Sequence, residues 1–252
     1  MDLVYPLKNN VTTLDLLFSL RSVCAHELPF DKVWCAGYTP LWLKDVYSIP
    51  VIQNKRSKWK NALYNVVAAC QRPEVSDDFI LMNDDFIQLN PCNPTKDLNV
   101  CGVSLQTRIA RYAELSNPSI WQQGFAKINK LLQDLRCDHF MDFALHLPMI
   151  INKRKFLEVF NLPQVQDFIA ENSYLPMRTL YGNMCWTNPV SISDVKIKQH
   201  EDMPLGWEKL QWISVYDNVI GNRKYPYLYG ILYPLHVKHC RYEQFGRRDY
   251  ER

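Results

Sequence analysis

Two adjacent aspartates, Asp84 and Asp85, are the side chains of this sequence best suited to chemistry. They follow residues 78–82, an apolar run that predicts a buried strand, with Asn83 between. Two carboxylates at the end of a buried strand are costly unless a cation neutralises them. Mg²⁺ and Mn²⁺ prefer carboxylate oxygens and keep positions open for substrate phosphates. The pair therefore predicts a divalent metal site that holds a diphosphate, although a turn or a helix cap explains two such aspartates equally well.

The elements around the pair determine where it lies. Short apolar runs alternate with helical periodicity through the first ninety residues, which is the pattern of a parallel sheet with helices on both faces. Ligands bind at the carboxyl ends of the strands in such a sheet, so this order favours a functional role for the aspartates. The predicted strands are 2–6, 32–36, 50–52 and 78–82, and the predicted helices are 13–26 and about fifteen residues that begin at Ser57.

The pattern is less regular beyond residue 90. Helical spacing recurs in 105–114, 118–135, 153–160 and 164–171. The last seventy residues are rich in Trp, Tyr and Pro and lack a clear period. No composition shift marks a linker, so we predict one domain, 1–252, that ends in an irregular C-terminal extension.

Composition narrows the classes of function. The 252 residues carry a net charge of +3, which permits an anionic partner without requiring one. The eight cysteines form no C-x-x-C pair, which argues against a zinc ribbon. The first residues lack the apolar stretch of a signal peptide, and no apolar run is long enough to span a membrane. We therefore expect a cytoplasmic protein with reduced thiols and no stable membrane insertion.

Several separated segments resemble nucleotide-sugar glycosyltransferases of the GT-A fold, in which a D-x-D-type motif ends a strand. The more specific resemblance is to the Stealth-like group, which includes capsular polysaccharide transferases and shares an L-N-D-D-F core. Residues 79–86 (FILMNDDF) match that core best. Weaker matches are 2–7 (DLVYPL), 18–22 (FSLRS), 58–61 (KWKN), 146–148 (HLP), Arg178 and 212–218 (WISVYDN). The resemblance implies a mostly parallel, Rossmann-like GT-A sheet flanked by helices, with 1–90 as the nucleotide-sugar half and 91–252 as the acceptor half.

The resemblance also implies a donor and its ligands. The donor is a nucleotide sugar, expected to be a UDP-sugar, and the cofactor is Mn²⁺ or Mg²⁺ held by Asp84, Asp85 and His146. A guanidinium matches phosphate oxygens bidentately, so Arg178 is expected at the phosphates, with a structural ion pair as an equal alternative. The other residues expected at the donor are Pro6, Leu7, Lys58, Asn61, Asn83 and Asp84. For Lys58 a solvated helix face is the alternative.

Three groups are predicted to accept the proton of the acceptor hydroxyl, namely His146, Asp142 and Asp217. His146 stands between two leucines, so a hydrogen-bonded core histidine is the alternative to a base or a third metal ligand. Asp217 follows an apolar run in the way that Asp84 does. Asp85 is expected to be essential for transfer through the metal.

The identity of the acceptor depends on the end of the chain. Residues 236–252 mix Lys and Arg with Tyr and Phe, which suits phosphate contact and base stacking as well as a simply solvated tail. This tail, the size of the chain and the expected lack of membrane attachment favour a hydroxymethylated pyrimidine in DNA, presented outside the base stack to a phage-type enzyme in the cytoplasm of a bacterial host. A glycan of surface polysaccharide is the alternative acceptor.

Two further functions are compatible with the sequence. One is sugar-1-phosphate transfer, as in the Stealth group proper, and the other is a non-enzymatic protein that binds nucleotide or nucleic acid. The opening VYPLK departs from the longer Y-T-W-V-D-G-type block of Stealth phosphotransferases, which favours simple glycosyl transfer.

Overall fold

The computed structural model describes residues 1–9, 13–53, 56–197, 206–215, 232, 234–235 and 239–244. The strands are β1 (Asp2–Leu7), β2 (Val33–Gly37), β3 (Tyr47–Pro50), β4 (Asp78–Leu81), β5 (Phe86–Gln88), β6 (Val100–Cys101), β7 (Met149–Asn152), β8 (Val190–Ser191), β9 (Lys196–Ile197) and β10 (Trp212–Val215). The helices are α1 (Thr13–Ala25), α2 (Lys58–Cys70), α3 (Pro94–Asp97), α4 (Leu105–Ala113), α5 (Ile120–Asp134), α6 (Lys153–Phe160), α7 (Pro163–Glu171), α8 (Met177–Cys185) and the short 3₁₀ helix η2 (Trp207–Lys209).

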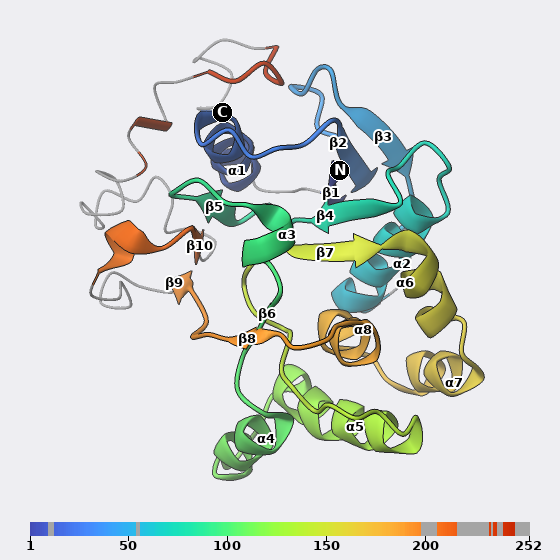
Figure 1. The fold of residues 1–252 in the computed structure, drawn as a ribbon. Coiled ribbons are helices and arrows are strands. Elements are labelled where there is room, and N and C mark those ends of the chain that lie inside the picture. The colour runs from blue at the N-terminus through green and yellow to red at the C-terminus, as the bar shows by residue number, and fades with distance from the viewer. Residues whose placement is uncertain are drawn as a thin grey trace.

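A five-stranded sheet in the order β3-β2-β1-β4-β7 forms the centre of the fold (Figure 1). β1, β2, β3 and β4 are parallel, and β7 runs antiparallel to β4. Helix α1 lies on one face of this sheet, whereas α2 and α6 lie on the other (Figure 1). The predicted mostly parallel α/β sheet with flanking helices is therefore confirmed.

Alternation along β1 divides the core between these two layers. Leu3 and Tyr5 pack with Leu16 of α1, whereas Val4 packs with Val66 of α2. All five side chains are fully buried. Successive strand side chains point to opposite faces of a sheet, so a strand that is apolar at every position requires a cover on both sides. Each such side chain contributes roughly 1.5–3 kcal/mol when it is fully buried.

Two smaller sheets continue the fold beyond the carboxyl end of β4. β10 joins antiparallel β5 to parallel β9, and β6 pairs with β8. The chain passes from β4 to β5 through a turn in which the N–H of Phe86 donates to the carbonyl of Asn83 at 3.3 Å. Asp84 and Asp85 are the turn residues. The two aspartates therefore lie where the central sheet meets the second sheet.

The helices and strands before residue 90 agree with the sequence predictions better than those after it. Ser57 is the N-cap of α2, and its hydroxyl accepts from the N–H of Lys60 at 3.3 Å, as its position before the helix predicts. The predicted strand 50–52 lies instead at β3, which ends at Pro50. Strand β10 lies in the apolar run that precedes Asp217. The short strands β5, β6, β8 and β9 were not predicted, because two or three residues show no readable period, and helix α8 was not predicted either.

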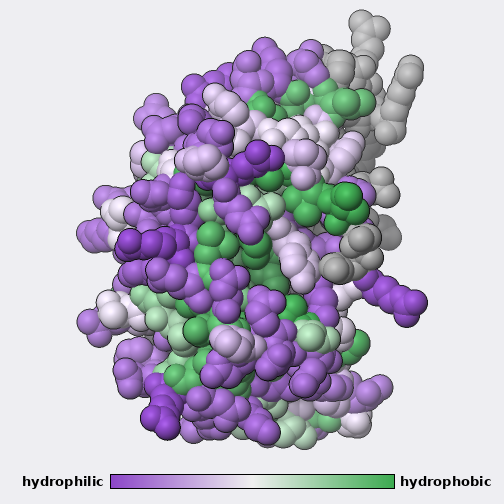
Figure 2. Space-filling model, turned by 90° about the vertical axis from the view of Figure 1, so that its right-hand side faces the viewer, coloured by the Kyte–Doolittle hydropathy of each residue, from purple (hydrophilic) through white to green (hydrophobic). Residues whose placement is uncertain are grey.

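Hydrophobic residues also reach the surface. On the side that carries α6 and α7, Figure 2 shows a band of hydrophobic residues bordered by hydrophilic ones. Among the described residues, the most exposed large apolar side chains are Leu41 and Ile52, at 83% and 84%. Among the helices of the described residues, none is long and apolar enough to cross a membrane.

Candidate functional site

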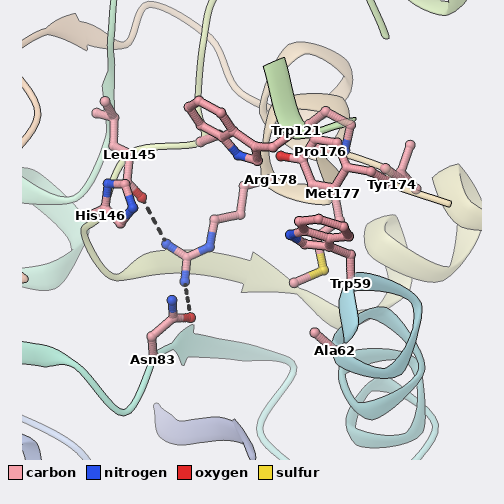
Figure 3. A pocket seen from close by; sticks show the side chains of 12 residues that line it. Trp59, Ala62, Asn83, Trp121, Leu145, His146, Tyr174, Pro176, Met177 and Arg178 are labelled. Carbon is pink, nitrogen blue, oxygen red and sulfur yellow. Dashed lines mark hydrogen bonds between the residues drawn. The ribbon is translucent and has the colours of Figure 1, made fainter. Parts of the chain in front are cut away.

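A cavity of about 200 Å³ opens beside the carboxyl end of β4. We call it the aromatic–arginine pocket, and its lining residues are Trp59, Ala62, Asn83, Trp121, Ala144, Leu145, His146, Tyr174, Leu175, Pro176, Met177 and Arg178. Figure 3 shows Arg178 between Asn83 and the backbone of Leu145, with Trp59 and Trp121 on the other side. The pocket brings together Asn83, His146 and Arg178, which lie far apart in the sequence and were all predicted site residues.

The guanidinium of Arg178 is held by neutral oxygens. One terminal nitrogen donates to the carbonyls of Leu145, at 3.4 Å, and Leu147, and the other donates to Asn83 Oδ1 at 3.1 Å. The guanidinium carbon lies 5.0 Å from the centre of the Phe86 ring, within cation–π range. These contacts fix the direction of the side chain without neutralising its charge.

Arg178 is a buried cation that no carboxylate of the described residues pairs with. The residue is 9% exposed. Burial lowers the pKa of Arg178 to about 10, and the more distant charges of Asp85 and Asp194 oppose that shift. The guanidinium is therefore still charged at neutral pH. Buried charges are normally paired, so this arrangement points to an anionic group of a ligand in the pocket.

Two indoles and a phenol form the opposite wall. The rings of Trp59 and Tyr174 meet edge to face at 4.8 Å between centroids. The hydroxyl of Ser57 donates to the carbonyl of Ser173, which ties the start of α2 to the segment before α8. Trp121 enters from α5. The wall is therefore assembled from three separate parts of the chain, and the sequence did not identify it.

His146 is paired with a carboxylate that the sequence did not indicate. Its Nδ1 lies 2.7 Å from Asp194 Oδ2, and its backbone N–H donates to Asp194 Oδ1 at 2.9 Å. The two side chains are 32% and 28% exposed, so His146 is not the buried core histidine that its leucine neighbours allowed. Asp194 is 48 residues away in the chain, in the connection between β8 and β9, and no pattern marks it.

Asp85 is occupied by an internal cation. Its Oδ2 accepts from Lys196 Nζ at 2.6 Å and from Ser214 Oγ at 2.5 Å. The Asp85 and Lys196 side chains are 11% and 13% exposed. The ammonium on β9 thus supplies the neutralising charge that the sequence reading assigned to a metal ion. Asp85 joins the turn after β4 to β9 and β10.

The three predicted metal ligands do not form a metal site in this structure. No group of three or more His, Cys, Asp or Glu side chains among the described residues is arranged to hold a metal ion. Asp85 is paired with Lys196, and His146 is paired with Asp194. Asp84 is half-buried in the turn and has contacts of its own. The donor set therefore does not fit a resident Mn²⁺ or Mg²⁺.

Asp142 lies beneath the pocket and not in it. The residue is fully buried, and its Oδ2 accepts from Arg108 Nε at 2.8 Å and from a terminal guanidinium nitrogen. Its Oδ1 accepts from the N–H of Ala144 at 2.8 Å and the hydroxyl of Thr179 at 3.4 Å. Both oxygens are occupied, so the predicted role as proton acceptor is corrected to a structural one that orders the segment before His146.

The predicted donor residues at the end of β1 lie outside the pocket. The carbonyl of Leu7 accepts from Gln53 Nε2 at 2.6 Å and Asn65 Nδ2 at 3.1 Å, and its side chain is buried. Pro6 is half-buried in the same strand. These two internal amides occupy the backbone carbonyl of Leu7, which was predicted to lie at the donor.

The other predicted residues have different positions. Lys58 is exposed and its ammonium lies 5.1 Å from the centre of the Trp59 ring, next to the pocket wall. Asn61 is half-buried in the first turn of α2. Asp217 lies outside the described residues. Arg21 of α1 forms an ion pair with buried Glu243 at 2.6 Å.

Comparisons with known proteins give a distant similarity. No family model matches the chain, and no curated protein matches it. Among solved structures it is similar to the crystal structure of galactosyltransferase LgtC in complex with donor and acceptor sugar analogues. The identity is 13%, the match covers 75% of this chain and 73% of that chain, and the TM-score is 0.44. Similarity at this level assigns neither a substrate nor a catalytic residue to the chain.

Proposed function

We propose that this protein is a glycosyltransferase that moves a sugar from a nucleotide diphosphate donor to an acceptor hydroxyl. The observation that carries the proposal is Arg178, a buried guanidinium without a carboxylate partner among the described residues, in a pocket beside the end of β4. A diphosphate supplies the missing negative charge in a geometry that a guanidinium matches. The sequence resemblance of residues 79–86 supports the same class of donor.

The roles of the pocket residues follow from their chemistry. Arg178 binds the diphosphate and neutralises the charge that develops when the bond from the anomeric carbon to the diphosphate oxygen breaks. Asn83 keeps the guanidinium in place through its 3.1 Å hydrogen bond. The acceptor oxygen attacks the anomeric carbon, and His146 takes the hydroxyl proton. The nucleoside diphosphate leaves as the second product.

The pocket lies at the junction of the two proposed halves of the chain. Trp59 and Asn83 belong to the half 1–90, and Trp121 and His146 belong to the half 91–252. We assign donor binding to the first half together with Arg178, and acceptor binding to the rest of the second half. The Trp59 and Trp121 rings offer flat apolar surfaces for the C–H face of a sugar.

A saccharide is the acceptor that we propose. The DNA acceptor was inferred from residues 236–252, of which the structure describes 239–244. Arg241 there hydrogen-bonds Tyr242 at 2.7 Å, and the Tyr242 side chain is buried. Glu243 of the same segment pairs with Arg21 of α1. These described tail residues pack against α1, so they do not supply the base-stacking surface on which the DNA inference depended.

The proposal assigns neutralisation of the diphosphate to Arg178 and not to a divalent ion. In the alternative arrangement the aspartate pair binds Mn²⁺ or Mg²⁺, and the metal competes with Lys196 for the charge of Asp85. Donor binding measured with Mn²⁺ and with a chelator separates the two arrangements. Equal affinity supports neutralisation by the protein, and binding only with Mn²⁺ restores the metal site predicted from the sequence.

Binding of UDP and UDP-sugars to wild type and two variants tests the proposal. Charge-assisted hydrogen bonds contribute about 1.5–3 kcal/mol, so Arg178→Lys, which loses the planar fork, is expected to weaken UDP binding about 10- to 100-fold. Arg154→Met removes an arginine that is 83% exposed on α6 and serves as the matched control. Unfolding curves establish that each variant is folded. Equal UDP affinity for wild type and folded Arg178→Lys contradicts the proposal.

Product analysis then distinguishes the related activities. Release of a nucleoside diphosphate identifies glycosyl transfer, whereas release of a monophosphate identifies sugar-1-phosphate transfer. UDP-sugar binding without turnover on any acceptor favours a binding protein. Transfer to hydroxymethylated DNA, with none to saccharides in a parallel assay, replaces the saccharide acceptor by DNA.

A further inference from the structure

The connection between β8 and β9 supplies a carboxylate with a fixed orientation. Asp194 Oδ1 accepts two backbone hydrogen bonds, from His146 and from Val195, both at 2.9 Å. Its Oδ2 faces His146 Nδ1 at 2.7 Å. Among the described residues, Nε2 of the same ring has no hydrogen-bond partner, and His146 lines the aromatic–arginine pocket. The imidazole of this pocket residue is therefore anchored through one nitrogen, and its other nitrogen is available.

We propose that Asp194 is a positioning residue that keeps the proton of neutral His146 on Nδ1 and leaves Nε2 as a proton acceptor for the pocket. An ionised carboxylate can only accept hydrogen bonds, so Nδ1 must carry the hydrogen between them. A neutral imidazole has one N–H, which leaves the lone pair on Nε2. This inference deepens the proposed function and rests on it for the identity of the proton donor, an acceptor hydroxyl.

The ionisation of Asp194 agrees with this assignment. Partial burial raises the pKa of the carboxyl, but the hydrogen bonds and charge of His146 and the N–H of Val195 outweigh burial, so the net shift is downward. Asp194 is accordingly a carboxylate at neutral pH. When Nε2 takes the hydroxyl proton, the O–H bond breaks, the oxygen bonds to the anomeric carbon, and the resulting imidazolium lies against a negative charge.

Asp194→Asn tests the assignment with almost no change in shape. The amide oxygen must remain at the Oδ1 position, because two backbone N–H groups donate there. The amide NH₂ then occupies the Oδ2 position and donates to Nδ1 of His146. A nitrogen that accepts this bond cannot carry the proton. The variant is therefore expected to move the proton of His146 to Nε2, and Nε2 then no longer accepts a proton.

Nitrogen-15 NMR of histidine-labelled protein near pH 8, where an unperturbed imidazole is neutral, reads the tautomer directly. His146→Ala identifies the His146 signals by their loss. The expected result is a protonated Nδ1 in wild type and a protonated Nε2 in Asp194→Asn. Ser193→Ala, which changes the neighbouring exposed residue, is expected to match wild type. A protonated Nε2 in wild type, or no change in Asp194→Asn, overturns the positioning role.

Kinetics of the same variants connect the tautomer to turnover. General base catalysis contributes about 10²–10⁴-fold, so Asp194→Asn and His146→Ala are each expected to lower kcat by about 100-fold or more with little change in donor KM. Wild-type kcat in Asp194→Asn with an inverted tautomer overturns the role of Nε2 as base. Absence of transfer by wild type counts against the proposed function, and the NMR result alone then decides whether Asp194 positions His146.

Discussion

The pairing of Asp85 with Lys196 makes a quantitative prediction that separates a structural ion pair from a metal ligand. Asp85→Ala removes the carboxylate that binds Lys196 Nζ at 2.6 Å, and both side chains are nearly buried. Removing one partner of a buried pair costs about 3–5 kcal/mol, because the other charge stays buried without compensation. The ammonium keeps hydrogen bonds to Ser214 Oγ at 3.1 Å and the carbonyl of Val215 at 3.3 Å, so we expect the lower end, about 3 kcal/mol.

Urea and thermal unfolding measure this loss. At about 2–4 °C per kcal/mol for a chain of this length, the Tm of Asp85→Ala is expected to fall by roughly 6–12 °C. Asp85→Ala combined with Lys196→Met leaves no uncompensated charge, so the double variant is expected to cost at least about 1 kcal/mol less than the sum of the single variants. Asp77→Ala is the control, since Asp77 is 86% exposed and its pair with Lys153 is expected to contribute at most about 1 kcal/mol.

Two results would refute this reasoning. One is a stability of Asp85→Ala within about 1 kcal/mol of wild type, because loss of the carboxylate from a nearly buried ion pair is expected to cost more than that. The other is additivity of the two single variants. Suppose instead that Asp85→Ala is as stable as wild type, and that its donor affinity is lower than that of wild type with Mn²⁺ but equal to it without Mn²⁺. The carboxylate is then a metal ligand. Loss of transfer in Asp85→Ala is evidence for chemistry only after this stability control.

Three further predictions follow from the geometry. Gly37→Ala is expected to destabilise the fold by at least about 1–3 kcal/mol in urea unfolding, because Gly37 has a φ of +104° and an added Cβ would clash with the carbonyl oxygen of Leu7. Asp142→Ala is expected to cost about 3–5 kcal/mol in the same assay, because it removes a fully buried carboxylate from its pair with Arg108, whose side chain is 17% exposed; a cost below about 1 kcal/mol contradicts its structural role. Cys24 is expected to react with iodoacetamide before Cys35, as followed by mass spectrometry. A hydrogen bond to a neighbouring thiol lowers the pKa of Cys24, whereas burial raises the pKa of Cys35 to about 12. Faster labelling of Cys35 would refute this prediction.

The predictability of the fold changes along the chain. Residues up to 90 follow a strand–helix alternation with long apolar runs, and β1, α1, β2, α2 and β4 were all predicted from it. Beyond that point β8 and β9 have two residues each, which is too short for a period. Arg178 and Thr179 have polar side chains, yet both are buried in α8. Polar residue types suggest exposed positions. Here tertiary contacts supply the hydrogen-bond partners, so these two residues are buried.

The residues of the candidate site also fall into those that the sequence predicted and those that it did not. Asn83, His146 and Arg178 were predicted from their residue types and from a sequence resemblance, and the structure places all three around one cavity. Asp194 and the rings of Trp59, Trp121 and Tyr174 were not predicted as site residues. Their roles depend on contacts between segments 48 or more residues apart, which no local pattern records.

The sequence by itself determined that this chain folds around a mostly parallel sheet and that the Asp84–Asp85 pair follows a buried strand. Hydrophobic periodicity is a local property, and it fixes which elements form and which strand end carries the pair. Only the tertiary structure decided which cation reaches which carboxylate. Lys196 arrives at Asp85 from β9, and Asp194 arrives at His146 from the preceding connection, because the second sheet folds back over the end of β4. Electrostatic energy depends on distances of a few ångströms in space, and separation along the chain does not determine those distances.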